Sequence, residues 1–172
     1  MRLEAVLALS LWLLAGATPP AVAKTPGEVE VGGILRDAPM QGLSGPSRLL
    51  SDYRGTPLII NVWASWCGPC RQEMASLDRL SRRYGEKQFV VIGISTDDYP
   101  DAARGFLQKS GTRFRHFIDT RLLLENMLGA DRIPLTILVD AKGRVLGKYY
   151  SAKEWDSPEA LAVIRQAFRI GE

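Results

Sequence analysis

Cysteine and histidine are scarce in this chain. Its 172 residues include two cysteines and one histidine, His116. A structural zinc site needs about four ligands, mostly sulfur and nitrogen, so the sequence predicts no metal centre of that kind. Both cysteines, Cys67 and Cys70, belong to one C-x-x-C segment, and none is left to cross-link a distant part of the chain. Because a bridge over two residues restricts the unfolded chain little, the spacing favours redox chemistry over a structural disulfide.

Strong net charge and long apolar runs are also missing. The formal charge is +3, and no block of lysine and arginine indicates binding to nucleic acid. The longest apolar run, residues 5–17, is shorter than the ~20 residues that span a bilayer. We find no internal repeat. The chain length and a hydrophobic content of 46% therefore predict a single packed domain.

Residues 1–23 have the features of a secretory signal peptide. Arg2 opens a short charged region, which Glu4 weakens, and the apolar run follows. Residues 21–23, Ala-Val-Ala, place small side chains at the spacing that a signal peptidase recognises. We expect cleavage before Lys24 and a periplasmic protein, with an uncleaved membrane anchor as the alternative.

After the signal peptide we expect a linker over residues 24–33, which are polar and contain glycine. Residues 34–172 then form the folded domain, with weak strand and turn signals before residue 55. The apolar run Leu-Ile-Ile-Asn-Val-Trp predicts a buried central strand. Beyond residue 55 the expected order is β-α-β-α-β-α-β-β-α, with strands at 58–63, 89–95, 113–118, 135–139 and 145–150 and helices at 67–84, 98–110, 121–128 and 158–168.

The two cysteines lie where the central strand gives way to a helix. A free cysteine has a pKa of about 8.5, and the unpaired amides of a helix N-terminus favour its thiolate. Cys67 is at that terminus, and Cys70 is one turn later on the apolar face. The sequence therefore predicts an attacking and a resolving thiol. We expect Gly68 to permit a tight turn and Pro69 to suit the first helical turn.

The segment Trp66-Cys67-Gly68-Pro69-Cys70 is identical to the thioredoxin active-site motif, and residues 61–74 resemble the TlpA/ResA branch of exported thioredoxin-like proteins. The resemblance extends over about residues 34–168. It implies an α/β thioredoxin fold, a central mixed β-sheet flanked by helices, with an N-terminal extension and an insertion between residues 95 and 118.

The resemblance also implies an activity. Members of the branch are mostly thiol–disulfide oxidoreductases that reduce exported clients, including cytochrome c precursors and copper-site proteins. A protein of this kind needs no cofactor, receives electrons from a membrane thiol donor and is expected to be a monomer.

Three further expectations follow from the resemblance. Glu73 stands at the branch's functional glutamate, where it could take a proton from Cys70; a solvated helical glutamate is the alternative. Asn61 replaces the buried aspartate of many thioredoxins. The Ile133-Pro134 bond is expected to be cis and to face the disulfide, an ordinary trans bond being the alternative. The residues expected to contact substrate are Trp66, Gly68, Pro69, Ile133 and Pro134.

Other functions stay open at this point. A disulfide oxidase or isomerase would use the same two cysteines, since the redox potential does not follow from the motif alone. A copper-binding chaperone is the alternative from another class, because two thiolates suit Cu(I). His116 could then serve as a third ligand, although a strand histidine is more often structural.

Overall fold

A seven-stranded mixed sheet forms the centre of the computed structural model, which describes residues 25–85 and 87–171. The expected signal peptide, residues 1–23, lies outside this part of the chain. The strand order is β2-β1-β5-β4-β3-β6-β7, with β3, β4 and β5 parallel and the other pairs antiparallel. The strands are β1 (Pro39–Gly42), β2 (Arg48–Leu49), β3 (Leu58–Trp63), β4 (Val90–Ser95), β5 (Arg115–Ile118), β6 (Leu135–Val139) and β7 (Val145–Tyr150).

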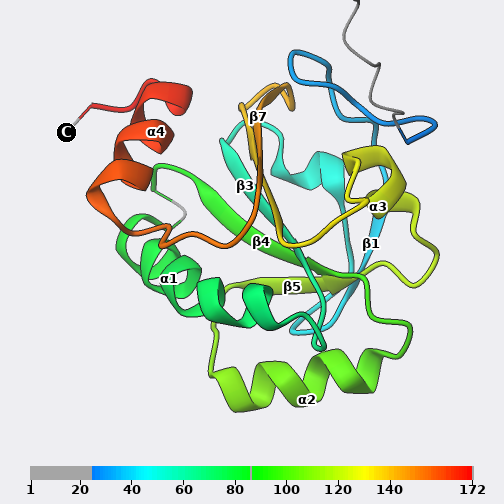
Figure 1. The fold of residues 1–172 in the computed structure, drawn as a ribbon. Helices are drawn as coiled ribbons and strands as arrows, with labels where there is room; N and C mark the ends of the chain where they lie inside the picture. Colours follow the sequence, from blue (N-terminus) through cyan, green and yellow to red (C-terminus); the bar gives the residue numbers. More distant parts are fainter. Residues whose placement is uncertain (1–24, 86, 172) are drawn as a thin grey trace, which may run out of the picture.

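Helices cover both faces of the sheet (Figure 1). One apolar cluster contains side chains of α1 (Gly68–Tyr84), α2 (Pro100–Ser110) and α4 (Pro158–Phe168). A second cluster, on the opposite face, contains those of α3 (Leu123–Leu128) and of the N-terminal segment. A short 3₁₀ helix, η1 (Leu50–Tyr53), leads into β3. This is the thioredoxin fold that the sequence predicts.

Strand β3 holds the two layers together because both of its faces are buried. Ile60 and Val62 point into the α3 cluster, whereas Ile59 and Trp63 point into the α1 cluster. Asn61 lies on the α1 face as well, by the period-two alternation of a strand. The strand then ends four residues before Cys67, so the sheet fixes the start of the active-site loop.

The insertion after β4 forms α2 and β5. Gly111 ends α2 in the left-handed conformation, with φ of 67°, as its position after the helix predicts. Strand β5 then pairs with β4 in parallel. The chain thus returns to the sheet, and the C-terminal ends of β3, β4 and β5 meet at one edge.

Helix α3 begins two residues later than the sequence predicts. Both carboxylate oxygens of Asp119 accept hydrogen bonds from backbone amides at the start of the helix, those of Leu123, Leu124 and Glu125, at 2.7–3.0 Å. An acidic group satisfies amides that have no partner within a helix. Residues 119–122 therefore form the turn before the helix.

The expectation of a free linker over residues 24–33 is wrong for the described part of that segment. The side chain of Val29 is buried, and its amide donates to the Met127 carbonyl at 2.8 Å. Gly32 and Gly33 exchange backbone hydrogen bonds with Val145, at 2.8 and 2.9 Å. Residues 25–33, which we call the N-terminal strap, thus pack against α3 and the start of β7.

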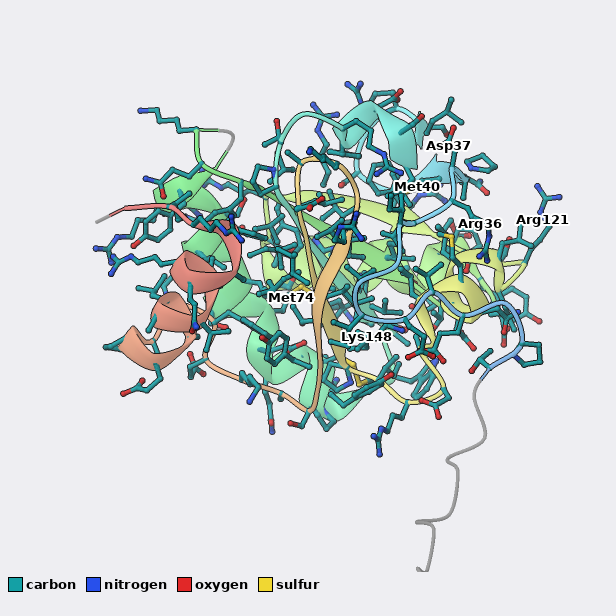
Figure 2. All side chains as sticks on the ribbon, turned by 90° about the horizontal axis from the view of Figure 1, so that it is seen from above. Arg36, Asp37, Met40, Met74, Arg121 and Lys148 are labelled. Carbon is teal, nitrogen blue, oxygen red and sulfur yellow. A yellow bond between two sulfur atoms is a disulfide. The ribbon has the colours of Figure 1, made fainter. Side chains whose placement is uncertain are left out.

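An ion pair fastens the strap to the sheet. The carboxylate of Glu28 accepts a hydrogen bond from the ammonium group of Lys148 on β7, and the two side chains are 13% and 8% exposed. Figure 2 labels Lys148 beside the blue N-terminal segment. Each of these two largely buried charges is stabilised by the other. Removing one residue of the ion pair leaves the opposite charge buried without a counter-charge.

We predict that Glu28→Gln destabilises the protein by about 3 kcal/mol, since it leaves the Lys148 ammonium without a counter-charge. The melting temperature should fall by roughly 6–12 °C in thermal unfolding followed by circular dichroism. Asp131→Asn, at an exposed position, is the control and should change stability by less than about 0.5 kcal/mol. Equal melting temperatures for Glu28→Gln and the control would show that the ion pair contributes nothing.

Candidate active site

The site begins with a disulfide between Cys67 and Cys70, whose Cα atoms are 5.3 Å apart. Cys67 is the N-cap of α1, and its Sγ accepts a hydrogen bond from the Cys70 amide at 3.2 Å. The amides at a helix N-terminus carry partial positive charge, which stabilises negative charge on sulfur. This geometry suits a thiolate at Cys67 once the disulfide is reduced.

The two sulfur-bearing residues differ in access. Cys67 is 5% exposed and Cys70 is 0% exposed, as expected for an outer and an inner cysteine. Cys70 lies on the same face of α1 as Met74 and Leu77, within the apolar cluster. An incoming disulfide can therefore reach Cys67 alone, and Cys70 is placed to attack the Cys67 sulfur from inside.

Gly68 and Pro69 occupy the first turn of α1. Proline suits this turn because its missing amide hydrogen has no helical partner there. The prediction that the turn requires glycine at residue 68 is wrong. The φ angle of Gly68 is not positive, and an added Cβ would have no heavy atom within 4 Å. Gly68 leaves open space beside the disulfide instead of permitting a strained turn.

A hollow of about 460 Å³ is lined on one side by Pro69 of the active-site motif. The Ile133–Pro134 peptide bond at its wall is cis, as the resemblance implies. Three of the residues expected to contact substrate, Pro69, Ile133 and Pro134, line the hollow together with Arg132 and Tyr150.

The two tryptophans near the cysteines have different places. Trp66 is 70% exposed and is available to a partner on the active-site surface. Trp63 is fully buried, with its ring centroid 5.3 Å from that of Phe106 and 5.4 Å from that of His116. Trp63 is therefore a core residue and does not belong to the active-site surface.

Glu73 is buried on α1, one turn after Cys70, with 1% of its surface exposed. Its Oε1 accepts a hydrogen bond from the side-chain Nδ2 of Asn61 at 2.6 Å. Its Oε2 accepts from the indole nitrogen of Trp155 at 3.0 Å and from the Lys153 amide at 3.2 Å. Glu73 is thus no solvated helical glutamate, and its carboxylate joins β3, α1 and the segment before α4.

The surroundings of Glu73 decide its titration. Burial raises the pKa of the Glu73 carboxyl above its ordinary value, while the hydrogen bonds from Trp155, Asn61 and Lys153 oppose that rise. A raised pKa brings a carboxyl closer to neutral pH, where it can both accept and release a proton.

Asn61 also binds across the sheet. Its Nδ2 donates to Thr136 Oγ1 at 3.0 Å, because β3 and β6 pair these two residues. Within residues 25–85 and 87–171 the Asn61 Oδ1 has no hydrogen-bond partner. An amide can rotate and present its oxygen in place of its nitrogen. Asn61 can therefore accept from a protonated Glu73 as well as donate to the ionised one.

Thr136 and Trp155 also belong to the site, although no sequence motif predicts them. Thr136 follows from the register of β3 with β6, which places it opposite Asn61. Trp155 lies in a connection without regular structure, 82 residues from Glu73, and carries no motif. A tryptophan in an otherwise polar connection is the one signal that the sequence offers.

His116 lies in the core among aromatic rings, its centroid 4.2 Å from that of Phe114. Burial lowers the pKa of His116 to about 3, so the side chain is neutral at physiological pH. Within the described residues, no three side chains of His, Cys, Asp or Glu gather as metal ligands. The position of His116 therefore does not support a role as a third copper ligand beside the two cysteines.

Comparison with known proteins agrees with this geometry. The Redoxin family model matches residues 38–164. The chain is 29% identical over 117 residues to the thiol-disulfide oxidoreductase ResA of Geobacillus thermodenitrificans, covering 68% of this chain and 67% of that protein.

Two solved structures are also similar. A protein assigned as a thiol:disulfide interchange protein DsbE, from Chlorobium tepidum, has a TM-score of 0.75 and 26% identity, covering 81% of this chain and 99% of that one. A protein from Bacteroides vulgatus, assigned as a thiol-disulfide oxidoreductase, has a TM-score of 0.71 and 25% identity, over 81% and 98%.

The chain therefore belongs to the Redoxin family, and its resemblance to ResA is confirmed. It is a thiol–disulfide oxidoreductase with the redox pair Cys67 and Cys70.

The raised pKa of Glu73 predicts a pH-dependent stability. Folding favours its protonated form, so this contribution is complete below the unfolded value, near pH 4.5, and is lost as the pH rises through the folded pKa. Glu73→Gln stays neutral at every pH, and rotation of the Asn61 amide can satisfy its new NH₂ group. The melting temperature of Glu73→Gln minus that of wild type should therefore increase with pH above 4.5. Glu159→Gln, at an exposed position, should show a flat difference; the same flat difference for Glu73→Gln would contradict the raised pKa.

Proposed function

We propose that this protein is exported and reduces disulfides in client proteins outside the cytoplasm. The observation that carries the proposal is the access at the site: Cys67 is partly accessible at a helix N-terminus, Pro69 of the same motif lines a hollow with cis-Pro134, and Cys70 is enclosed. The signal-like residues 1–23 support export to the periplasm. Across the described part of the chain, no helix is both long and apolar enough to cross a membrane.

The reaction begins at Cys67. Its thiolate attacks a client disulfide, one client thiolate leaves, and Cys67 is joined to the client as a mixed disulfide. The Cys70 thiolate then attacks the Cys67 sulfur, so that the client departs with two thiols and the protein keeps the disulfide. A membrane thiol donor returns two electrons and two protons before the next cycle.

Substrate contacts follow from the surface around Cys67. The exposure of Trp66 and the hollow lined by Pro69, Ile133 and Pro134 support the proposal that a client chain binds there. Gly68 has open space where a side chain would stand, next to Cys67 in the motif. The residues Gly68-Pro69 and Ile133 resemble those of reducing thioredoxins, which favours reduction over oxidation. Cytochrome c precursors and copper-site proteins are the client classes that the family suggests. We expect the enzyme to act as a monomer.

Glu73 is the proposed proton acceptor for Cys70. The resolving thiol attacks as a thiolate, so its proton must leave before the mixed disulfide can be resolved. Glu73 stands three residues after Cys70 on the same helix, where side chains are neighbours. Its raised pKa and its hydrogen-bonded setting suit a carboxyl that takes up a proton and later gives it back.

Replacing the resolving cysteine tests the order of attack and the client class together. We predict that Cys70→Ser, expressed as the full chain, accumulates mixed disulfides between Cys67 and exported proteins, because the second step is blocked. Diagonal electrophoresis followed by mass spectrometry identifies the partners. Cys67→Ser is the matched control and should capture none. Capture by Cys67→Ser and not by Cys70→Ser would reverse the roles.

The net direction needs its own measurement. In an insulin assay with a thiol donor, the wild type should accelerate disulfide reduction. A protein that instead oxidises a reduced test protein faster than it reduces insulin would be an oxidase. Titration of the reduced protein with Cu(I) addresses the chaperone alternative, and tight binding without insulin reduction would favour it.

We predict that Glu73→Gln slows disulfide exchange by about 100-fold, the lower end of the usual range of about 100- to 10,000-fold for a lost general base. Glutamine keeps the size of the side chain but cannot carry the proton from Cys70. Stopped-flow kinetics of the resolving step, measured from pH 5 to 9, should show a changed pH profile with an unchanged circular dichroism spectrum. Asp52→Asn is the control. If the rate and the pH profile both match wild type, Glu73 is a structural carboxylate only.

A further inference from the structure

Asp97 is a buried acidic residue that the reaction described above does not use. It lies just after β4, at the edge of the sheet where β3 also ends, and 2% of its surface is exposed. Ser95, the last residue of β4, donates its hydroxyl to Asp97 Oδ2 at 2.7 Å. The Asp97 amide donates in return to Ser95 Oγ at 3.1 Å. The carboxylate is thereby fixed to the end of a central strand.

The remaining bonds of this carboxylate go to the active-site loop. The Ser65 amide donates to Asp97 Oδ2 at 2.9 Å, and the Ser65 hydroxyl donates to Oδ1 at 2.6 Å. Ser65 is two residues before Cys67. Asp97 therefore anchors the loop between the end of β3 and the start of α1 to the end of the neighbouring strand β4.

The contribution of this anchor depends on the redox state. In the oxidised protein the disulfide itself ties Cys67 to α1. Reduction removes that covalent restraint. The hydrogen bonds that do not involve a sulfur are those of Ser65 to Asp97, that of the Cys67 amide to the Ala64 carbonyl at 3.1 Å, and that of the Arg71 amide to the Cys67 carbonyl at 3.2 Å. Two thiols react as an internal pair only while they stay close and aligned.

We propose that Asp97 is a positioning residue for thiol–disulfide exchange, whose carboxylate holds the loop before Cys67 in the geometry needed to form the internal disulfide. It touches neither sulfur and acts through Ser65. The proposal rests on the exchange activity of the Cys67–Cys70 pair and not on the net direction of the reaction, so it holds for a reductase or an oxidase.

The proposal predicts a change in the redox equilibrium. In glutathione buffers the protein dithiol reduces glutathione disulfide: two glutathione thiols leave with two electrons and two protons, and the Cys67–Cys70 bond forms. Asp97→Ala should lower this equilibrium constant about tenfold, because the freed loop of the dithiol form must then be ordered again before the disulfide forms, and ordering about one residue costs about that much. A tenfold change corresponds to a rise of about 30 mV in the reduction potential.

A purely structural role would lower the free energy of unfolding but leave the equilibrium constant of the folded protein unchanged. Asp97→Asn is the conservative variant. Its oxygen can accept from the Ser65 amide and its NH₂ group can donate to Ser65 Oγ, so it should recover most of the wild-type constant. Asp98→Ala removes the same charge from the exposed neighbouring residue and should behave as wild type.

Ser65→Ala keeps the experiment decisive if Asp97→Ala does not fold. Ser65 is half-buried, and this substitution removes one of its two hydrogen bonds to Asp97. The equilibrium constant with glutathione should therefore fall by about threefold, less than for Asp97→Ala. The proposal is wrong if a folded Asp97→Ala, or Ser65→Ala in its absence, matches wild type. It is also wrong if Asp98→Ala changes the potential as much as Asp97→Ala, since charge alone would then explain the effect.

Discussion

The buried carboxylate of Glu73 is the contact on which the arrangement of this site depends. A carboxylate removed from water is costly unless hydrogen bonds replace its hydration. Here the replacements come from Asn61 on β3, from Trp155 and from the Lys153 backbone. Each donor must be in place for the burial to be tolerated, so strand, helix and C-terminal connection fix one another. The same three hydrogen bonds oppose the rise in pKa that burial causes.

The redox pair lies at the start of α1, about one turn before Glu73, and hydrogen bonds from neighbouring elements hold the loop that leads to it. Strand β3 delivers the chain to the loop, α1 begins at the disulfide, and Asp97 ties the loop to the end of β4. Cis-Pro134 lines a hollow together with Pro69 of the motif, and Trp66, the residue before Cys67, is exposed. A rigid frame with one accessible sulfur is what stepwise exchange needs, because the second thiol must meet the first sulfur and not the solvent.

Local sequence was enough to predict the elements around the cysteines. The apolar run of β3, the proline in the first turn of α1 and the Ser157-Pro158 start of α4 are signals contained within a few residues, and the structure confirms them. The contiguous motif likewise identifies Cys67 and Cys70. The fold of the N-terminal strap could not be predicted in this way, because Glu28 meets its partner Lys148 across 120 residues. The start of α3 was misplaced for a different reason: its capping carboxylate, Asp119, is near in sequence but precedes the helix by four residues, and the N-cap residue Leu122 has no capping side chain.

The setting of Glu73 shows the same division. Its position in the motif indicated a role, but its burial depends on Trp155, 82 residues away, and on the strand register that places Thr136 beside Asn61. Gly68 gives the opposite case, in which a local rule predicted a conformational need that the backbone does not have. Local patterns thus specify helices, strands and the redox motif, whereas the chemistry beneath the motif is set by contacts between distant segments.

The most direct test of this account is the titration of Glu73 itself, followed by carbon-13 NMR of the labelled side-chain carboxyl in the disulfide and dithiol forms. The account predicts a pKa above the ordinary glutamate value in the disulfide form and a different pKa in the dithiol form, because the nearby thiols then share the proton. An ordinary pKa that is the same in both forms would contradict it.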